Sequence, residues 1–199
     1  MNKCILQRPY VTPDPLPIIK PEDINLKACD FFGTENPMAL GWGINKFQKF
    51  NSRDNESIYT HSGIIMNGQG DTIESLWTVD SQNIWKHYAG KRVIIARWEF
   101  LEDWQWEKAY TMIMDKHWKK KYPIWRLPLQ IIPPLAKYLS FTGMPVCSEL
   151  VAKVEYYIKA RHKWWTGTTP DILADEWRRW KGYSVMAEGI IEQPIENTG

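Results

Sequence analysis

Two short runs rich in apolar and β-branched residues lie near the middle of the chain and predict a β-hairpin. They cover residues 57–66 and 72–77. The residues between them, 67–71, have the order Asn-Gly-Gln-Gly-Asp, which is typical of a tight turn. We therefore expect two antiparallel strands that are joined by this turn.

The position of the turn determines which side chains share a face of the sheet. If the loop is centred between residues 68 and 69, Gly63 pairs with Glu74. Positions two apart along a strand share a face, so His61 and Glu74 then become diagonal neighbours. A shift of the turn by one residue would separate them, so this expectation depends on the register.

A later stretch has the spacing of a helix that buries one face. Its apolar residues recur at intervals of three and four, at Leu150, Val151, Val154, Tyr157 and Ile158. Cys147 lies on the same stripe, and Pro145 suits a helix start, where no N–H is needed. The thiol of Cys147 should therefore lie at the first turn of a helix and face the protein body.

The pattern predicts further elements before and after this helix. They are a short helix at residues 44–50, a strand at residues 92–98, a helix capped by Asp103 that runs to about Lys120, a short helix capped by Thr169 with Pro170 at its first position, and a strand around residues 183–187. The helix after the Asp103 cap should bury a stripe made of Ala109, Tyr110, Ile113, Met114 and His117.

Prolines divide the chain into regions. Pro9, Pro13, Pro15, Pro17 and Pro21 predict an extended arm. We expect this arm at residues 1–22, one domain at residues 23–190 and a polar tail at residues 191–199. The arm can pack along the domain or bind a protein partner. Residues 122–144 are apolar and broken by prolines, so they can form a packed connection, a lid over a groove or a surface that meets lipid.

The composition limits the class of protein. With 199 residues, 44% of them hydrophobic and 24% charged, the chain suits a soluble globular domain. A net charge of +2 gives no general attraction to nucleic acid. Three widely spaced cysteines predict neither a disulfide framework nor a zinc site, and we expect no cofactor. We also expect no signal peptide and no transmembrane segment, which favours the cytoplasm or an assembled particle over secretion.

Cys147, His61 and Glu74 supply the three groups that thiol catalysis needs. A helix start stabilises a thiolate, a histidine can take the thiol proton, and a carboxylate can fix the tautomer of the histidine. The alternative is structural, because a cysteine is often a small buried hydrophobe and a strand histidine or carboxylate often has no catalytic role. Weaker candidates are His87, His117, His162, Cys4 and Cys29.

Four motifs in a fixed order resemble the circularly permuted papain-like, NlpC-type cysteine hydrolases, a group that includes enzymes similar to lecithin–retinol acyltransferase. The motifs are Thr60-His61-Ser62-Gly63-Ile64, Thr72-Ile73-Glu74-Ser75, Val146-Cys147-Ser148-Glu149-Leu150-Val151 and Thr169-Pro170-Asp171-Ile172-Leu173. The resemblance implies an α+β, circularly permuted papain-like fold with an antiparallel sheet packed against the nucleophile helix. Cys29 departs from the family, because it stands where a Leu-x-x-Gly-Asp segment often has glycine.

Together, the residues and the resemblance predict a cysteine peptidase or amidase. Cys147 would attack an amide carbonyl, His61 would act as base, and Glu74 would orient the imidazole. The backbone N–H of Cys147 and the side chain of Tyr59 are the candidate oxyanion donors. The resemblance implies cell-wall peptides or related amides as substrates. Two alternatives stay open: a lipid-directed acyltransferase or thioesterase with the same triad, and a catalytically idle binding or structural module.

Overall fold

The computed structural model describes residues 11–35, 58–121, 146–162 and 168–193. Within these ranges the strands form one seven-stranded sheet with the order β1-β7-β6-β2-β3-β4-β5. The strands are β1 (Ile18–Ile19), β2 (Phe31–Thr34), β3 (His61–Ile65), β4 (Asp71–Ser75), β5 (Val79–Asn83), β6 (Arg92–Trp98) and β7 (Tyr183–Ile191). Neighbouring strands are antiparallel except β1 and β7, which are parallel.

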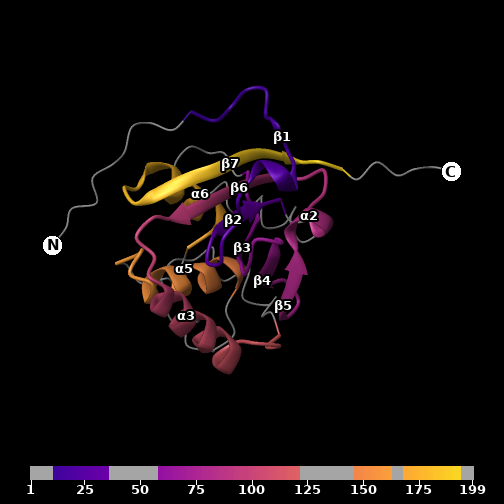
Figure 1. Ribbon diagram of the computed structural model, residues 1–199. Helices are drawn as coiled ribbons and strands as arrows, with labels where there is room; N and C mark the ends of the chain where they lie inside the picture. Colours follow the sequence, from indigo (N-terminus) through magenta and orange to yellow (C-terminus); the bar gives the residue numbers. More distant parts are fainter. Residues whose placement is uncertain (1–10, 36–57, 122–145, 163–167, 194–199) are drawn as a thin grey trace.

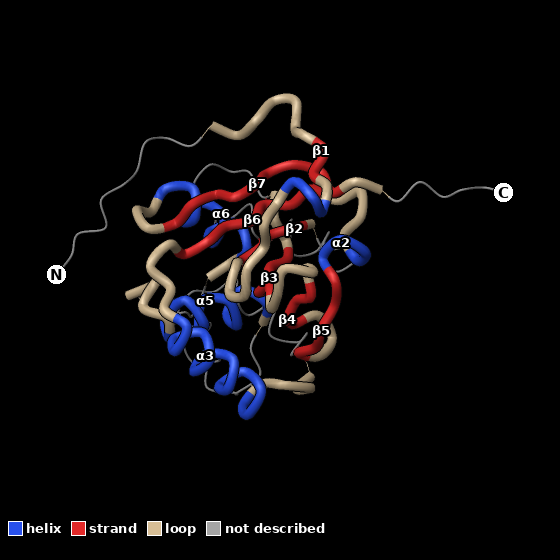
Figure 2. Tube along the Cα trace, viewed as in Figure 1, coloured by secondary structure: helices blue, strands red, loops and turns tan. Residues whose placement is uncertain are grey.

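Helices cover both faces of this sheet (Figures 1 and 2). They are α2 (Ile84–His87), α3 (Asp103–Lys116), α5 (Cys147–Tyr157) and α6 (Pro170–Arg179), with a short 3-10 helix η1 (Pro21–Asp23). The larger core cluster combines side chains of α3, α5 and α6 with one face of the sheet. The smaller cluster combines α2 and the N-terminal segment with the other face. The expected α+β class is therefore confirmed.

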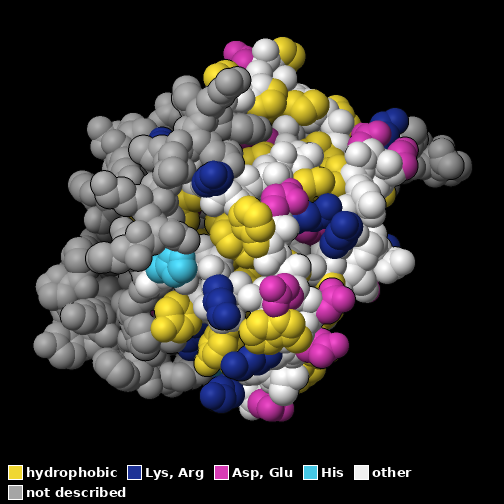
Figure 3. All heavy atoms as spheres, turned by 60° about the vertical axis from the view of Figure 1, so that its left-hand side comes forward, with side chains coloured by type: hydrophobic (Ala, Val, Ile, Leu, Met, Phe, Trp, Pro, Cys, Tyr) yellow, Lys and Arg dark blue, Asp and Glu magenta, His cyan; other side chains and the backbone are white. Residues whose placement is uncertain are grey.

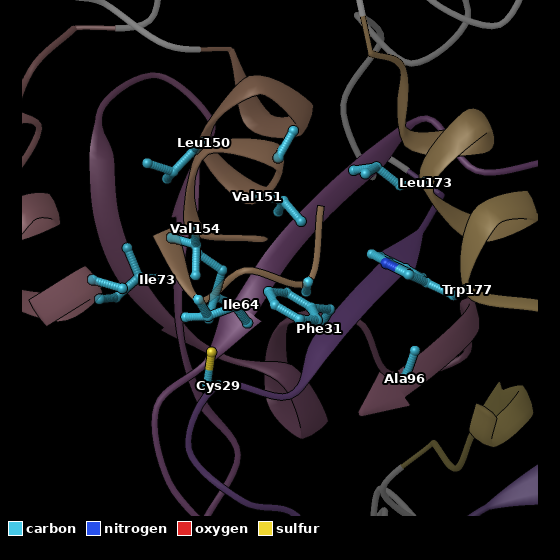
Figure 4. Packing of buried hydrophobic residues seen from close by; sticks show 14 of the residues in the cluster. Cys29, Phe31, Ile64, Ile73, Ala96, Leu150, Val151, Val154, Leu173 and Trp177 are labelled. Atoms are coloured by element: carbon cyan, nitrogen blue, oxygen red, sulfur yellow. The ribbon is translucent and has the colours of Figure 1, made fainter. Parts of the chain in front are cut away.

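Helix α5 packs over the hairpin through its apolar stripe. Leu150, Val151 and Val154 are fully buried and face Ile64 of β3 and Ile73 of β4 (Figure 4). This contact places the start of α5 beside the strands that carry the expected histidine and glutamate. The expected helix start at Cys147 is confirmed, whereas Pro145 lies outside the described residues.

The register of the hairpin is the one that the turn predicts. Gly63 pairs with Glu74, and the backbone N–H of Met66 donates to Asp71 O at 2.7 Å. Gly70 has a φ of 85°, in the left-handed region that favours glycine. The side chains of His61 and Glu74 therefore lie on one face of the sheet, as expected.

Four elements of the sheet region were not predicted. Strand β2 is fully buried and pairs with both β3 and β6, although its sequence indicated only the beginning of the domain. Strand β5 and helix α2 occupy residues 79–87, for which the pattern predicted no helix or strand. Strand β1, within the proline-rich arm, joins the sheet beside β7.

The helix after residue 102 differs from the prediction at both ends. Its N-cap is Glu102 rather than Asp103, and it ends at Lys116 rather than about Lys120. Its buried residues are Gln105, Ala109, Met112 and Ile113. Tyr110 is 38% exposed, so the predicted buried stripe was wrong at this residue. The helix starts at residue 103 with Gln105 on its inner face, and this phase turns Tyr110 outward.

The remaining predicted elements have mixed outcomes. The Thr169 side chain caps α6 by accepting a hydrogen bond from Ile172 N at 3.2 Å, as expected. The last strand is longer than predicted and runs to Ile191. The predictions for residues 44–50 and 122–144 lie outside the described residues. In the described parts of the chain, no helix has the length and apolar character that a membrane crossing requires.

Figure 3 shows the face of the molecule over the left-hand side of Figure 1. On this face, apolar side chains are separated by Lys, Arg, Asp and Glu side chains (Figure 3). Among the exposed large apolar residues of the chain are Phe100 (64%), Trp104 (49%) and Tyr156 (41%). Scattered apolar residues of this kind are normal on a protein surface.

Candidate active site

His61 is the first residue of β3 and is 1% exposed. Its Nε2 lies 2.7 Å from Oε2 of Glu74, which is on the neighbouring strand β4 and is also 1% exposed. A carboxylate only accepts, so Nε2 carries the proton of this hydrogen bond. The arrangement fixes the tautomer of the imidazole and leaves Nδ1 for another partner.

The second partner of His61 is the thiol of Cys147. Cys147 is the first residue of α5 and is 4% exposed, and its thiol interacts with the His61 ring closely enough to raise the pKa of the imidazole. Because Nε2 is bound to Glu74, Nδ1 is the ring nitrogen that is left to exchange a proton with the thiol. The structure therefore brings together the three side chains that the sequence selected, in the order thiol, imidazole, carboxylate.

Glu74 accepts three side-chain hydrogen bonds inside the protein. Besides His61, the donors are Thr72 Oγ1, which lies 2.6 Å from Oε1, and the hydroxyl of Tyr88, which binds Oε2. Burial alone would raise the pKa of Glu74, but the hydrogen bonds and the charge of His61 lower it. Glu74 is therefore held as a carboxylate.

Opposing effects set the protonation of His61. Burial alone would lower the pKa of His61, because it disfavours the charged ring. The hydrogen bonds and charges of Cys147 and Glu74 outweigh burial and raise the pKa of His61 to about 10. The raised pKa favours the protonated imidazole, which is the state required for a thiolate–imidazolium pair.

Tyr59 does not join these residues as an oxyanion donor. Its hydroxyl donates to Oε1 of Glu188 at 2.7 Å, and the guanidinium groups of Arg92 and Arg178 stack on its ring. Burial and the negative charge of Glu188 raise the pKa of Tyr59. The single phenol proton is already donated to a buried carboxylate, so the structure gives no support to the predicted role.

Cys29 has a structural position. It is 2% exposed, its φ is 68°, and its N–H donates to Ile65 O at 2.8 Å. Burial, followed by the charges of Asp30 and Glu155, raises the pKa of its thiol. This left-handed backbone is the conformation that glycine adopts most easily, and it occurs where the resemblance indicated a glycine.

The other histidines lie at or beyond the ends of helices, and the ring of His87 contacts that of Tyr88, with 4.8 Å between the centroids. His117 is buried at the end of α3, with its Nε2 3.4 Å from Nζ of Lys153. His87 ends α2 and His162 is exposed after α5. Among the residues that the structure describes, no group of three or more His, Cys, Asp and Glu side chains is placed to hold a metal ion.

Two residues that donate to Glu74, Thr72 and Tyr88, were not among the predicted site residues. Thr72 lies two positions before Glu74 on the same strand face, and the alternation of a strand could have indicated it. Tyr88 follows α2, in a stretch for which no helix or strand was predicted. Nothing in the local sequence pattern connects it to Glu74.

No protein-family model and no curated protein matches the chain. Among solved structures, the chain is similar to the crystal structure of metalloprotein yiiX from Escherichia coli O157:H7, a DUF1105 protein, with a TM-score of 0.49 and 16% sequence identity. The similarity covers 85% of this chain and 90% of that chain. A similarity of this size does not bear on activity.

Proposed function

We propose that this protein is a cysteine hydrolase of the peptidase or amidase type, with Cys147 as nucleophile, His61 as base and acid, and Glu74 as the orienting carboxylate. One observation carries the proposal. Nε2 of the buried His61 ring lies 2.7 Å from Oε2 of Glu74, and the Cys147 thiol interacts with the same ring and raises its pKa. A structural histidine needs one or two satisfied partners, but it does not need a thiol at a helix start as one of them.

We infer further that the fold is the circularly permuted papain-like, NlpC-type fold. Support comes from the order of the elements, in which strand β3 carries the histidine, strand β4 the glutamate, and the later helix α5 the cysteine. The left-handed backbone at Cys29 also supports the inference, because that position often holds glycine in the family.

The proposed reaction has two halves. The Cys147 thiolate attacks the amide carbonyl carbon and forms a C–S bond, and the resulting oxyanion collapses as the C–N bond breaks. Protonated His61 gives its proton to the leaving amine. Neutral His61 then takes a proton from water, which attacks the thioester and releases the acid and the Cys147 thiolate. Glu74 stays ionised and orients the ring in both halves.

The helix start contributes to the first half of this reaction. Cys147 is the first residue of α5, so its backbone N–H is one of those that have no acceptor within the helix. An N–H in this place can donate to the oxyanion of the tetrahedral intermediate, and the helix dipole has the sign that favours negative charge there.

The first test asks whether Cys147 is an activated thiol. The full-length protein is treated with iodoacetamide near neutral pH, and the labelled cysteines are identified by peptide mass spectrometry. We expect selective labelling of Cys147 over Cys4 and Cys29, and loss of this selectivity in His61→Ala. Equal, slow labelling of all three cysteines would contradict the proposal and favour an idle binding module.

The second test identifies the acyl group. The protein is incubated separately with cell-wall peptides and with phospholipid vesicles, and covalent adducts are sought by intact-protein mass spectrometry. We expect peptide products, and their absence in Cys147→Ala. An acyl adduct from the vesicles, with no action on the peptides, would replace the amidase by the lipid-directed acyltransferase.

A further inference from the structure

Tyr88 is a fully buried residue that reaches the site from outside the hairpin. It is the C-cap of α2, and its backbone N–H donates to Ile84 O at 3.1 Å. The start of α2 is attached to the hairpin turn, because Ile84 N donates to Gly70 O at 2.8 Å. The backbone of Tyr88 is therefore fixed relative to strand β4.

The hydroxyl of Tyr88 binds the carboxylate oxygen that also holds the histidine. Oε2 of Glu74 accepts from both His61 Nε2 and the Tyr88 hydroxyl, whereas Oε1 accepts from Thr72. A glutamate side chain has three rotatable bonds, and Thr72 holds only Oε1. Without Tyr88, a single hydrogen bond would hold Oε2, so the second donor on Oε2 restricts the atom that orients the imidazole.

The ring of Tyr88 also limits the movement of the histidine. The His61 and Tyr88 rings lie 6.0 Å apart between centroids with an interplanar angle of 28°. The Phe32 ring contacts both, at 6.2 Å from His61 and 5.7 Å from Tyr88. This packing depends on the ring and not on the hydroxyl, so replacement by phenylalanine separates the two contributions.

We propose that Tyr88 is a positioning residue of the Cys147 site, whose hydroxyl holds the Glu74 carboxylate aimed at Nε2 of His61. The inference rests on the proposed function, since only a working triad needs this carboxylate to be held. Two observations support it independently: the shared oxygen atom and the packing of the Tyr88 ring beside the imidazole.

The decisive variant is Tyr88→Phe, which removes the hydroxyl and keeps the ring. The carboxyl resonance of Glu74 is followed by NMR in protein labelled with ¹³C at glutamate side-chain carboxyls, and is assigned by its loss in Glu74→Gln. A hydrogen bond to the ionised form favours that form, so its removal should move the protonation midpoint of Glu74 to higher pH, by about one unit. An unchanged midpoint in a folded variant would overturn the proposal.

Tyr183→Phe provides a matched control. The Tyr183 hydroxyl donates to another buried carboxylate, Oε1 of Glu155, at 2.9 Å. Its removal should leave the Glu74 midpoint unchanged. An equal shift in Tyr183→Phe would show that general loosening, and not the lost donor, causes the effect.

A kinetic measurement tests the consequence for the reaction. With p-nitrophenyl acetate as a generic ester probe, Tyr88→Phe should lower kcat about tenfold and leave KM nearly unchanged, because the hydroxyl acts on Glu74 and not on the substrate. Tyr183→Phe should keep the wild-type kcat. A Tyr88→Phe enzyme with the kcat of the wild type would contradict a positioning role.

If Tyr88→Phe does not fold, the unmodified protein answers the same question. The Cζ resonance of Tyr88, in protein labelled with ¹³C at that carbon of tyrosine, should change with the same midpoint as the Glu74 carboxyl. If the chemical shift of Tyr88 Cζ does not change as the Glu74 carboxyl titrates, the inference is overturned. Failure of the proposed function looks different, because Cys147 would then label as an ordinary thiol whatever Tyr88 does.

Discussion

The charge of His61 should depend directly on Glu74. Glu74→Gln keeps the size of the side chain and removes its negative charge. In the wild-type protein the raised pKa of His61, about 10, means that the imidazolium is present at neutral pH and is lost as the pH rises through that value. Without the carboxylate, the imidazolium should be lost at lower pH.

The size of this shift follows from the contact between the two residues. His61 Nε2 and Glu74 Oε2 are 2.7 Å apart, and both side chains are buried. Hydrogen bonds to charged groups contribute about 1.5–3 kcal/mol, which corresponds to about one to two pH units. Cys147 raises the pKa of His61 through both its hydrogen bond and its charge, so Cys147→Ala should also lower the midpoint of His61.

The assay is an NMR titration of the His61 ring. The protein is labelled with ¹³C at the histidine Cε1, and the His61 resonance is assigned by its loss in His61→Gln. Asp80→Asn serves as the control, because Asp80 pairs with Glu74 across β5 and β4 and undergoes the same chemical change. The reasoning would be refuted if the protonation midpoint of His61 in Glu74→Gln were at or above that of the wild type. An equal shift of the His61 midpoint in Asp80→Asn would also refute it.

Three further predictions concern packing, capping and burial. Gly63→Ala should lower the free energy of unfolding in urea by about 1–3 kcal/mol, because a Cβ there would lie 2.5 Å from the Phe32 ring; unchanged stability would contradict this close packing. Thr169→Ala should cost about 1 kcal/mol in the same measurement, since the threonine caps α6 through Ile172 N, and Thr169→Ser, which keeps the hydroxyl, should recover most of it. Cys29 should react with iodoacetamide only after unfolding, because burial and the charges of Asp30 and Glu155 raise the pKa of its thiol and so disfavour the reactive thiolate; rapid labelling at Cys29 in the native protein would contradict this.

The parts of the fold that follow from local rules could be predicted from the sequence. The hairpin register followed from its turn, and Glu74 does pair with Gly63. The start of α5 followed from a stripe of apolar residues, and the start of α6 from its capping threonine. Each of these features depends on interactions between residues that are close together in the chain.

The missed elements depend on distant neighbours or are too short to show a period. Strand β2 has four residues and is stabilised by β3 and β6, which come later in the chain. Strand β5 is mostly polar, with one buried residue, Val79, so its sequence lacks a clear apolar face. Tyr59 was expected at the site because strand alternation would put it on the face of His61. Strand β3 begins only at His61, and Tyr59 instead packs in the larger core cluster with its hydroxyl on Glu188 of β7.

In the proposed site, the contacts of Glu74 depend on helix α2, which carries none of the side chains of Cys147, His61 and Glu74. Helix α2 has four residues, and a helix of this length is not stable in isolation. Its first N–H binds Gly70 O in the hairpin turn, where a Cβ would lie 2.5 Å from the Trp85 ring. The same turn sets the register that places Glu74 beside His61, so it positions both the carboxylate and the helix that brings Tyr88 to it. A change in this turn therefore alters two contacts of Glu74 at once, although no residue of the turn touches the thiol in the proposed mechanism.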